Sequence, residues 1–379
     1  MKKDKLPIYL DHNASTPILP AVLDAMLPYL KDHFGNASST HVYGTTMLAA
    51  VDQARSRVAG LIECAPDEVF FTSGGTEANN LAIRGVAAAI SERRQIVTSI
   101  IEHPATQGPC ALLERHGYAV FRAPVDGTGR VKPDAIRAAL NEDTVLVTIM
   151  HANSETGTLQ PIPELADAAH DMGALVHTDA AQSCGKVNMS VDRERVDLLS
   201  IAGHKLYAPQ GVGALYLRSA TPIHPLLIGA GHERGLRPGT ENVASIVGLG
   251  KACEIARSTL VEEGERQSRL RDRLWHYLQQ QVPGIALNGH PTDRLPNTLN
   301  LRFPGVSGNA LLDACPGIAA STGSACHEAG ENASAVILAM GIPQDQAIGS
   351  VRLTLGRDND QGEIDQAAKL LHQAWQKLI

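Results

Sequence analysis

Short, β-rich apolar runs alternate with longer helical patterns between residues 68 and 217 of this chain. Strands and helices that alternate in this way form βαβ units, which build a mostly parallel sheet with helices on its faces. The sequence therefore predicts an α/β protein with a mainly parallel seven-stranded sheet flanked by helices. The seven runs with strand character are Val69-Phe70-Phe71, 95–100, 119–121, 144–149, 174–177, 197–201 and 213–217.

The pattern changes after a long helical stretch that starts near Glu241 and runs towards Val282. A length of 379 residues suits two domains. We expect a large domain over residues 15–255 and a smaller α+β domain formed by residues 1–14 and 256–379. The small domain is predicted from short strands at 285–287, 298–303 and 350–355 and from helices near 309–313, 333–340 and 361–378.

The composition and residue spacing of the chain argue against several classes of binding partner. A net charge of −7 and an aromatic content of 4% argue against a nucleic-acid surface, which needs basic patches and stacking rings. The six cysteines lack CxxC spacing and the histidines lack HxxxH or HExxH spacing, so neither a disulfide framework nor a metal site is indicated. No apolar run suits a signal peptide or a membrane span. We expect a soluble cytoplasmic protein.

Polar residues follow many of the predicted strands. In a parallel sheet, ligands bind at the carboxyl ends of the strands, so residues placed there converge although they are far apart in sequence. We expect one site at this edge, built from Thr72-Ser73-Gly74-Gly75, His103, Asn153, Asp179 and His204-Lys205.

The chemistry of these residues suits pyridoxal phosphate (PLP). Lys205 can form a Schiff base if it is held in place and partly desolvated, although a lone lysine after a strand is more often a solvated charge. Asp179 ends an apolar run, where a carboxylate can bond a pyridinium N–H or simply cap a helix. Gln182, three residues on, can reach the phenolic oxygen of such a ring.

Three further features fit the same chemistry. The glycine-rich turn 72–76 offers backbone N–H groups to a phosphate, or is an ordinary βα turn capped by Thr76. His103 can stack on a flat ring and shuttle protons near neutral pH. Cys326 lies in a polar stretch, unlike most free cysteines, and suggests a thiol nucleophile. Together the residues indicate PLP chemistry on sulfur.

With these motifs in order, the chain resembles the cysteine desulfurases of the class-V aminotransferase superfamily, PLP enzymes of fold type I, over nearly its whole length. The resemblance implies a homodimer that converts L-cysteine to L-alanine and passes sulfur to an acceptor or scaffold protein. The motifs that carry it are residues 9–17, 34–38, 72–80, Glu102-His103, 153–157, 177–182, Gly203-His204-Lys205, 237–242, 321–326 and 351–357.

The resemblance also implies roles for single residues. Lys205 would hold PLP as a covalent internal aldimine, Asp179 would pair with the ring nitrogen and Gln182 with the phenolic oxygen, and His103 would stack on the ring. The phosphate would be held by Gly75, Thr76 and His204, and by Thr240 of the partner subunit.

Asn153 and Arg352 would fix the substrate carboxylate, for which a guanidinium is a natural partner. Cys326, on a mobile loop of the small domain, would attack the substrate sulfur and keep it as a persulfide. The catalytic residues would thus be Cys326, Lys205 and His103.

Two departures from the family pattern leave alternatives open. Ala202 stands where many desulfurases have serine, which removes a hydroxyl from the expected phosphate site, and Ser154 replaces a frequent asparagine. Some of the motifs also resemble selenocysteine lyases, which release selenide and L-alanine. A plain PLP aminotransferase or β-lyase and a non-catalytic PLP-fold scaffold are further alternatives. The acceptor pathway stays open between iron–sulfur cluster assembly, tRNA thiolation and DNA phosphorothioation.

Overall fold

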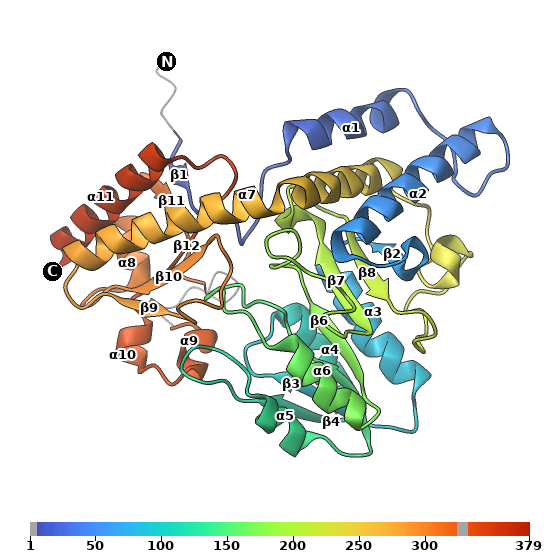
Figure 1. The fold of residues 1–379 in the computed structure, drawn as a ribbon, viewed down its shortest axis with the longest axis horizontal. Helices are drawn as coiled ribbons and strands as arrows, with labels where there is room; N and C mark the ends of the chain where they lie inside the picture. Colours follow the sequence, from blue (N-terminus) through green and yellow to red (C-terminus); the bar gives the residue numbers. More distant parts are fainter. Residues whose placement is uncertain (1–5, 324–332) are drawn as a thin grey trace.

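The computed structural model describes residues 6–323 and 333–379 (Figure 1). Its central sheet has seven strands in the order β2-β8-β7-β6-β5-β3-β4, so the prediction of a seven-stranded sheet is confirmed. The strands are β2 (Val69–Thr72), β3 (Gln95–Ser99), β4 (Ala119–Ala123), β5 (Thr144–Thr148), β6 (Leu175–Asp179), β7 (Leu198–Ala202) and β8 (Gly213–Leu217).

Strand β8 is antiparallel to both of its neighbours, whereas the other pairs in this sheet are parallel. The connection from β7 to β8, residues 203–212, is shorter than the dozen or so residues that a parallel crossover needs. The chain therefore turns back on itself directly after β7. This tight return carries Lys205, in the 3-10 helix η2 (Gly203–Lys205).

Helices cover both faces of the central sheet (Figure 1). Successive strand residues point to opposite faces of the sheet. Ile96 and Leu146 belong to the hydrophobic cluster on the face covered by α3, and Val97 and Val147 belong to the cluster on the face covered by α2 and α7. The helices of this part are α1 (Pro20–Lys31), α2 (Val42–Ile62), α3 (Gly75–Ala89), α4 (Pro104–Arg115), α5 (Pro133–Ala139), α6 (Ile162–Asp171) and α7 (Val243–Gln281), and two further 3-10 helices are η1 (Pro66–Glu68) and η3 (His232–Gly235).

A second, smaller sheet is antiparallel and has the order β12-β10-β9. Near it, β1 pairs in parallel with β11, so the N-terminal segment joins the C-terminal part of the chain. The elements here are β1 (Ile8–Tyr9), β9 (Ala286–Asn288), β10 (Thr298–Arg302), β11 (Ile318–Ala319), β12 (Ser350–Thr354), α8 (Gly308–Asp313), α9 (Ala335–Ala339), α10 (Gln344–Ala347) and α11 (Gln361–Leu378).

The long helix α7 runs alongside both sheets (Figure 1). Leu249 and Ala256 in its first half belong to the hydrophobic cluster of the central sheet, and Leu270 and Leu278 in its second half belong to the cluster of the small sheet. The predicted division of the chain near residue 255 stays a prediction. Within the described residues, no helix is both long enough and apolar enough to cross a membrane.

Candidate active site

Lys205 lies directly after the carboxyl end of β7. Its Nζ donates hydrogen bonds to the backbone oxygens of Asn13, at 2.5 Å, and Ala14, at 2.7 Å. The turn that places it requires glycine at position 203, because a Cβ there would lie 2.7 Å from the backbone oxygen of Val212. The amine is thus half-buried and held by the N-terminal segment, as a Schiff-base lysine needs to be.

Asp179 ends the neighbouring strand β6 and pairs in register with Ser200 of β7. One carboxylate oxygen accepts a hydrogen bond from the backbone N–H of Ala181 at 2.9 Å, and the other accepts from Nδ2 of Asn79 at 2.7 Å. The residues after Asp179 form turns, not a helix, so the helix-cap alternative does not apply. A carboxylate accepts about four hydrogen bonds, so this buried group keeps capacity for a further donor.

The N-terminus of α3 lies against the ends of these two strands. A Cβ at Gly75 would meet the side chain of Ala202 at 3.2 Å and that of Ala181 at 4.0 Å. The helix starts at Gly75, earlier than the glycine-rich turn suggested, and its N-cap is Gly74, which offers no side-chain hydrogen bond. Thr76 is therefore not the cap, and the backbone N–H groups of the first turn suit a phosphate.

His103 is the N-cap of α4, where its Nδ1 accepts a hydrogen bond from the backbone N–H of Ala105 at 3.1 Å. Desolvation is the largest cause that lowers the pKa of His103; nearby Asp179 raises it and Lys205 lowers it, with a net decrease. A neutral ring whose Nδ1 accepts a hydrogen bond must carry its own proton on Nε2. Proton uptake at Nδ1 would break the cap, so this geometry favours stacking over proton shuttling.

His204 is half-buried beside Lys205, and its Nδ1 shares a hydrogen bond with the hydroxyl of Ser15 at 3.3 Å. Burial is the main reason that its pKa falls to about 4, and interactions with nearby Lys205, His103 and Lys186 lower it further. The ring is therefore neutral at physiological pH and can donate one hydrogen bond to an anion.

The proposed carboxylate-binding residues lie where the two sheets meet. Arg352 is buried on β12, with Nη2 bonded to Oδ1 of Asp11 at 2.8 Å and Nη1 to the backbone oxygen of Ser154 at 3.2 Å. Asn153 is fully buried, and its Oδ1 accepts from the backbone N–H groups of Glu155, at 2.9 Å, and Thr156, at 3.0 Å. The amide of Asn153 thus holds its own turn, and its role towards substrate stays a prediction.

Glu155 contacts residues at both ends of the segment that carries the predicted nucleophile. Its Oε2 accepts a hydrogen bond from the hydroxyl of Ser334 at 2.5 Å, and a Cβ at Gly323 would lie 2.5 Å from the same oxygen. Cys326 itself lies outside the described residues. Since Ser154 contacts Arg352, the chain enters and leaves this segment beside the predicted substrate site.

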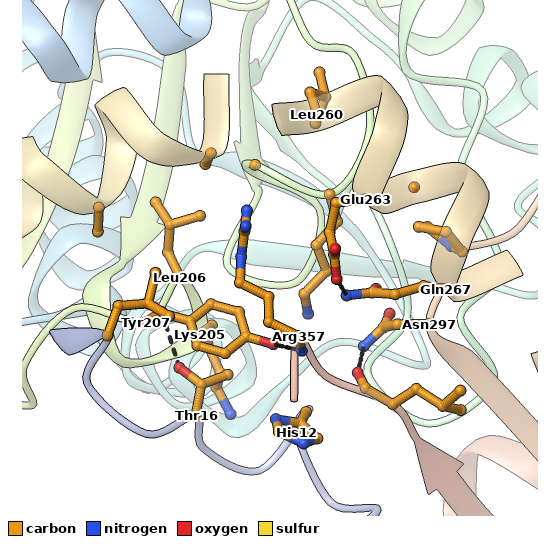
Figure 2. A pocket seen from close by; sticks show the side chains of 18 residues that line it. His12, Thr16, Lys205, Leu206, Tyr207, Leu260, Glu263, Gln267, Asn297 and Arg357 are labelled. Carbon is orange, nitrogen blue, oxygen red and sulfur yellow. Dashed lines mark hydrogen bonds between the residues drawn. The ribbon is translucent and has the colours of Figure 1, made fainter. Parts of the chain in front are cut away.

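Behind Lys205, a narrow pocket opens between the N-terminal segment and α7 (Figure 2). Figure 2 shows Thr16 and Tyr207 next to each other at its wall, where the backbone N–H of Tyr207 donates to Oγ1 of Thr16 at 2.8 Å. Lys186, on the turn after β6, lines the same pocket. Two lysines therefore share this small space.

Thr240 is exposed in the loop before α7. Arg237 in this loop pairs with Glu77 in the first turn of α3, at 2.8 Å. The loop is thus tied to the helix whose N-terminus suits a phosphate, while Thr240 faces solvent.

Comparison with known proteins identifies the family. The sequence matches the family model of class-V aminotransferases over residues 8–367. It is 44% identical over 377 residues to the cysteine desulfurase IscS of Dictyoglomus turgidum, which covers 99% of this chain and 96% of that protein. This chain belongs to the cysteine desulfurase family. The family expected from the sequence motifs is thereby confirmed.

Solved structures agree with this desulfurase fold. A NifS-like protein matches with a TM-score of 0.91 at 35% identity, over 97% of this chain and 99% of the other. The structure of SspA in complex with cysteine matches with a TM-score of 0.82 at 32% identity, over 92% of this chain and 98% of the other. The fold class and the enzyme class are confirmed, and the family implies PLP as cofactor.

Several residues that shape the candidate site were not predicted from the sequence. Asn13 bonds both Lys205 and Gln182 through its backbone oxygen, and Asn79 holds Asp179. Asn13 and Asn79 lie within family motifs, which could have marked them as site residues. Lys186 lies in none of these motifs, and the only sequence signal for it is its position four residues after Gln182.

Proposed function

We propose that this chain is a PLP-dependent cysteine desulfurase that converts L-cysteine to L-alanine and leaves a persulfide on Cys326. One arrangement carries the proposal: Asp179 ends β6 and Lys205 follows the adjacent parallel strand β7, and the N-terminus of α3 lies against the same two strand ends. An amine, an acceptor and a phosphate-binding helix end are the three groups that PLP requires.

The residues present fit this cofactor. Lys205 would carry it covalently, Asp179 would accept the ring N–H, and Gln182 would donate to the phenolic oxygen. His103 would stack on the ring through its neutral imidazole. When bound, the cofactor draws electrons from Cα of an amino acid substrate. The phosphate would be bound by the backbone of Gly75 and Thr76, by His204 and by Thr240 of the partner subunit.

The chain's own residues account for the sulfur step. Arg352, fixed by Asp11, would bind the substrate carboxylate together with Asn153, and the Lys205 amine would move a proton at Cα. The Cys326 thiolate would then attack the substrate sulfur. An S–S bond forms, the substrate C–S bond breaks, and the carbon takes up a proton and leaves as alanine. Cys326 keeps the sulfur for an acceptor protein.

Exposed apolar side chains support a homodimer. Leu30 is 60% exposed at the end of α1, and Phe34, Val42 and Tyr43 are 69%, 71% and 53% exposed near the start of α2. Apolar groups gathered in this way mark an interaction surface. A second copy of the chain would cover them and would bring the exposed Thr240 to the partner's cofactor.

The cysteines support a reducing compartment such as the cytoplasm. The five cysteines within the described residues, Cys64, Cys110, Cys184, Cys253 and Cys315, are all unpaired. Burial raises the pKa of Cys110 and of Cys184 to about 12, so these thiols stay protonated and inert. This leaves Cys326 as the thiol proposed to react.

Replacement of the cofactor-carrying lysine tests this proposal. Lys205→Ala should lose the visible absorbance of the lysine-bound cofactor and all alanine production from L-cysteine. Lys251→Ala is the matched control, because Lys251 pairs with Glu254 on α7, away from the site. A Lys205→Ala protein that keeps both properties would contradict the proposal. Alanine from L-selenocysteine but not from L-cysteine would instead identify a selenocysteine lyase.

A further inference from the structure

Lys186 is a second lysine in contact with the site. It lies on the turn after β6, four residues beyond Gln182, and is partly buried. Its Nζ donates hydrogen bonds to Oε1 of Gln182 and to Oδ1 of Asn13, both at 3.2 Å. Two amide oxygens from distant parts of the chain therefore converge on one amine.

No salt bridge joins Lys186 to a carboxylate within the described part of the chain. Burial is the largest cause that lowers its pKa, to about 7, and the positive charges of Lys205 and Arg352 act in the same direction, against a small opposite effect of Cys184. A partly buried lysine without a carboxylate partner lowers the stability of the folded protein, because its charge is partly desolvated. Such a residue at a cofactor site calls for a functional reason.

The amide of Gln182 has two ends that are not equivalent. Nε2 donates to the backbone oxygen of Asn13 at 3.0 Å, and the same oxygen accepts from Nζ of Lys205 at 2.5 Å. The donor end of Gln182 thus lies on the Lys205 side, and the acceptor end lies on the Lys186 side. A reversed amide would direct its NH₂ group at the amine of Lys186, which is also a donor.

Asn13 is itself fixed, so it cannot rotate to suit a different arrangement. Its Nδ2 donates to Oγ1 of Thr298 at 2.9 Å and to the backbone oxygen of Ser154 at 3.1 Å. Its Oδ1, which accepts from Lys186, also accepts from Nδ2 of Asn297 at 3.0 Å. Lys186 therefore bonds two acceptors whose orientations are mutually consistent.

We propose that Lys186 is a positioning residue: by holding Oε1 of Gln182, it keeps the Nε2 donor of that amide turned towards the phenolic oxygen of the cofactor on Lys205. This inference rests on the proposed function, because it needs the cofactor at Lys205. The protonated Lys186 amine carries three donors and no acceptor, so it bonds Oε1 of Gln182 and cannot accept a hydrogen bond from a reversed amide.

A double-mutant cycle on the cofactor-loaded protein tests the inference. The variants are Lys186→Met, Gln182→Ala and the double variant, and the readout is the pH at which the visible absorbance of the lysine-bound cofactor changes. A donor to the phenolic oxygen stabilises the charged form of that oxygen, so a Gln182 amide that is wrongly oriented should shift this pH. Lys186→Met should shift it by on the order of half a pH unit or more with Gln182 present, and by much less in the Gln182→Ala background.

Equal shifts in both backgrounds would overturn the inference, since Lys186 would then act through its charge alone. No shift in either background would overturn it as well. Lys186→Arg keeps a cationic donor and should restore part of the wild-type value. If Lys186→Met does not fold, Lys186→Leu serves the same comparison. A wild-type protein without lysine-bound cofactor would instead contradict the proposed function.

Discussion

Buried Arg352 pairs with half-buried Asp11, and Nη2 of the arginine donates to Oδ1 of the aspartate at 2.8 Å. The pair joins β12 to the segment after β1, and the backbone oxygen of Ser154 holds a second nitrogen of the same guanidinium. Nε of Arg352 has no hydrogen-bond partner among the described residues. The guanidinium is thus fixed in place while it keeps donors for a carboxylate.

Asp11→Ala should weaken the binding of L-cysteine. Without the aspartate, the guanidinium of Arg352 loses its orientation, and KM should rise about tenfold while kcat changes less. Steady-state kinetics of alanine formation measure both constants. Asp365→Ala is a matched control, because Asp365 pairs with Arg273 on the surface. An unchanged KM would show that Asp11 does not orient the substrate site.

Glu155→Gln should slow sulfur transfer without affecting the cofactor. Glu155 contacts Ser334 and Gly323, which flank the segment that contains Cys326, and a neutral amide weakens the charge-assisted bond to Ser334. We expect persulfide formation to slow several-fold while the visible absorbance of the cofactor stays unchanged. Rapid-quench mass spectrometry measures the rate, with the surface variant Glu265→Gln as control. Equal rates in both variants would exclude this role.

Ala202→Ser should tighten cofactor binding. Ala202 lies against Gly75 at the start of α3, where a serine hydroxyl would add one donor near the expected phosphate. One added hydrogen bond corresponds to a dissociation constant roughly two- to tenfold lower. Titration of cofactor-free protein with PLP measures this constant. Weaker binding by the serine variant would mean that the phosphate does not lie at this helix end.

Glu102→Gln should change how stability depends on pH. Burial is the main reason that the pKa of Glu102 rises from 4.5 to about 8, against bonds from Ser99 and Met150 that lower it. Because the folded-state pKa is raised, the stabilising contribution is fully present below pH 4.5 and is lost as pH rises through 8.

Glutamine cannot ionise, so between these pH values the wild type should lose up to about 1.4 kcal/mol of unfolding free energy per pH unit relative to the variant. Urea unfolding at several pH values measures the difference. Parallel pH profiles for the two proteins would show that Glu102 does not titrate in this way.

The fold was largely predictable because strands that are buried on both faces have continuous apolar runs in the sequence. All seven runs became strands of the central sheet. The antiparallel direction of β8 was not predicted, although the short connection 203–212 implies it. The strands β1 and β11 have two residues each, too few for a periodic signal, and they pair residues about 310 positions apart.

Residues at strand ends were predictable as a site, because topology alone brings Asp179 and Lys205 together. The network around Asn13 was not, since it depends on how the N-terminal segment packs across the site. The start of α3 also differed from the alternative with Thr76 as cap, because Gly74, with a φ of 150°, is the N-cap and the helix starts at Gly75.

The central claim is that sulfur from L-cysteine moves to Cys326. The most direct test is a single turnover with L-cysteine, followed by peptide mass mapping and alanine quantification, in the wild type and in Cys326→Ser and Cys64→Ser. We predict one added sulfur on the Cys326 peptide for each alanine formed, lost in Cys326→Ser and kept in Cys64→Ser. Alanine at the wild-type rate from Cys326→Ser, or added sulfur on another cysteine, would contradict the desulfurase mechanism.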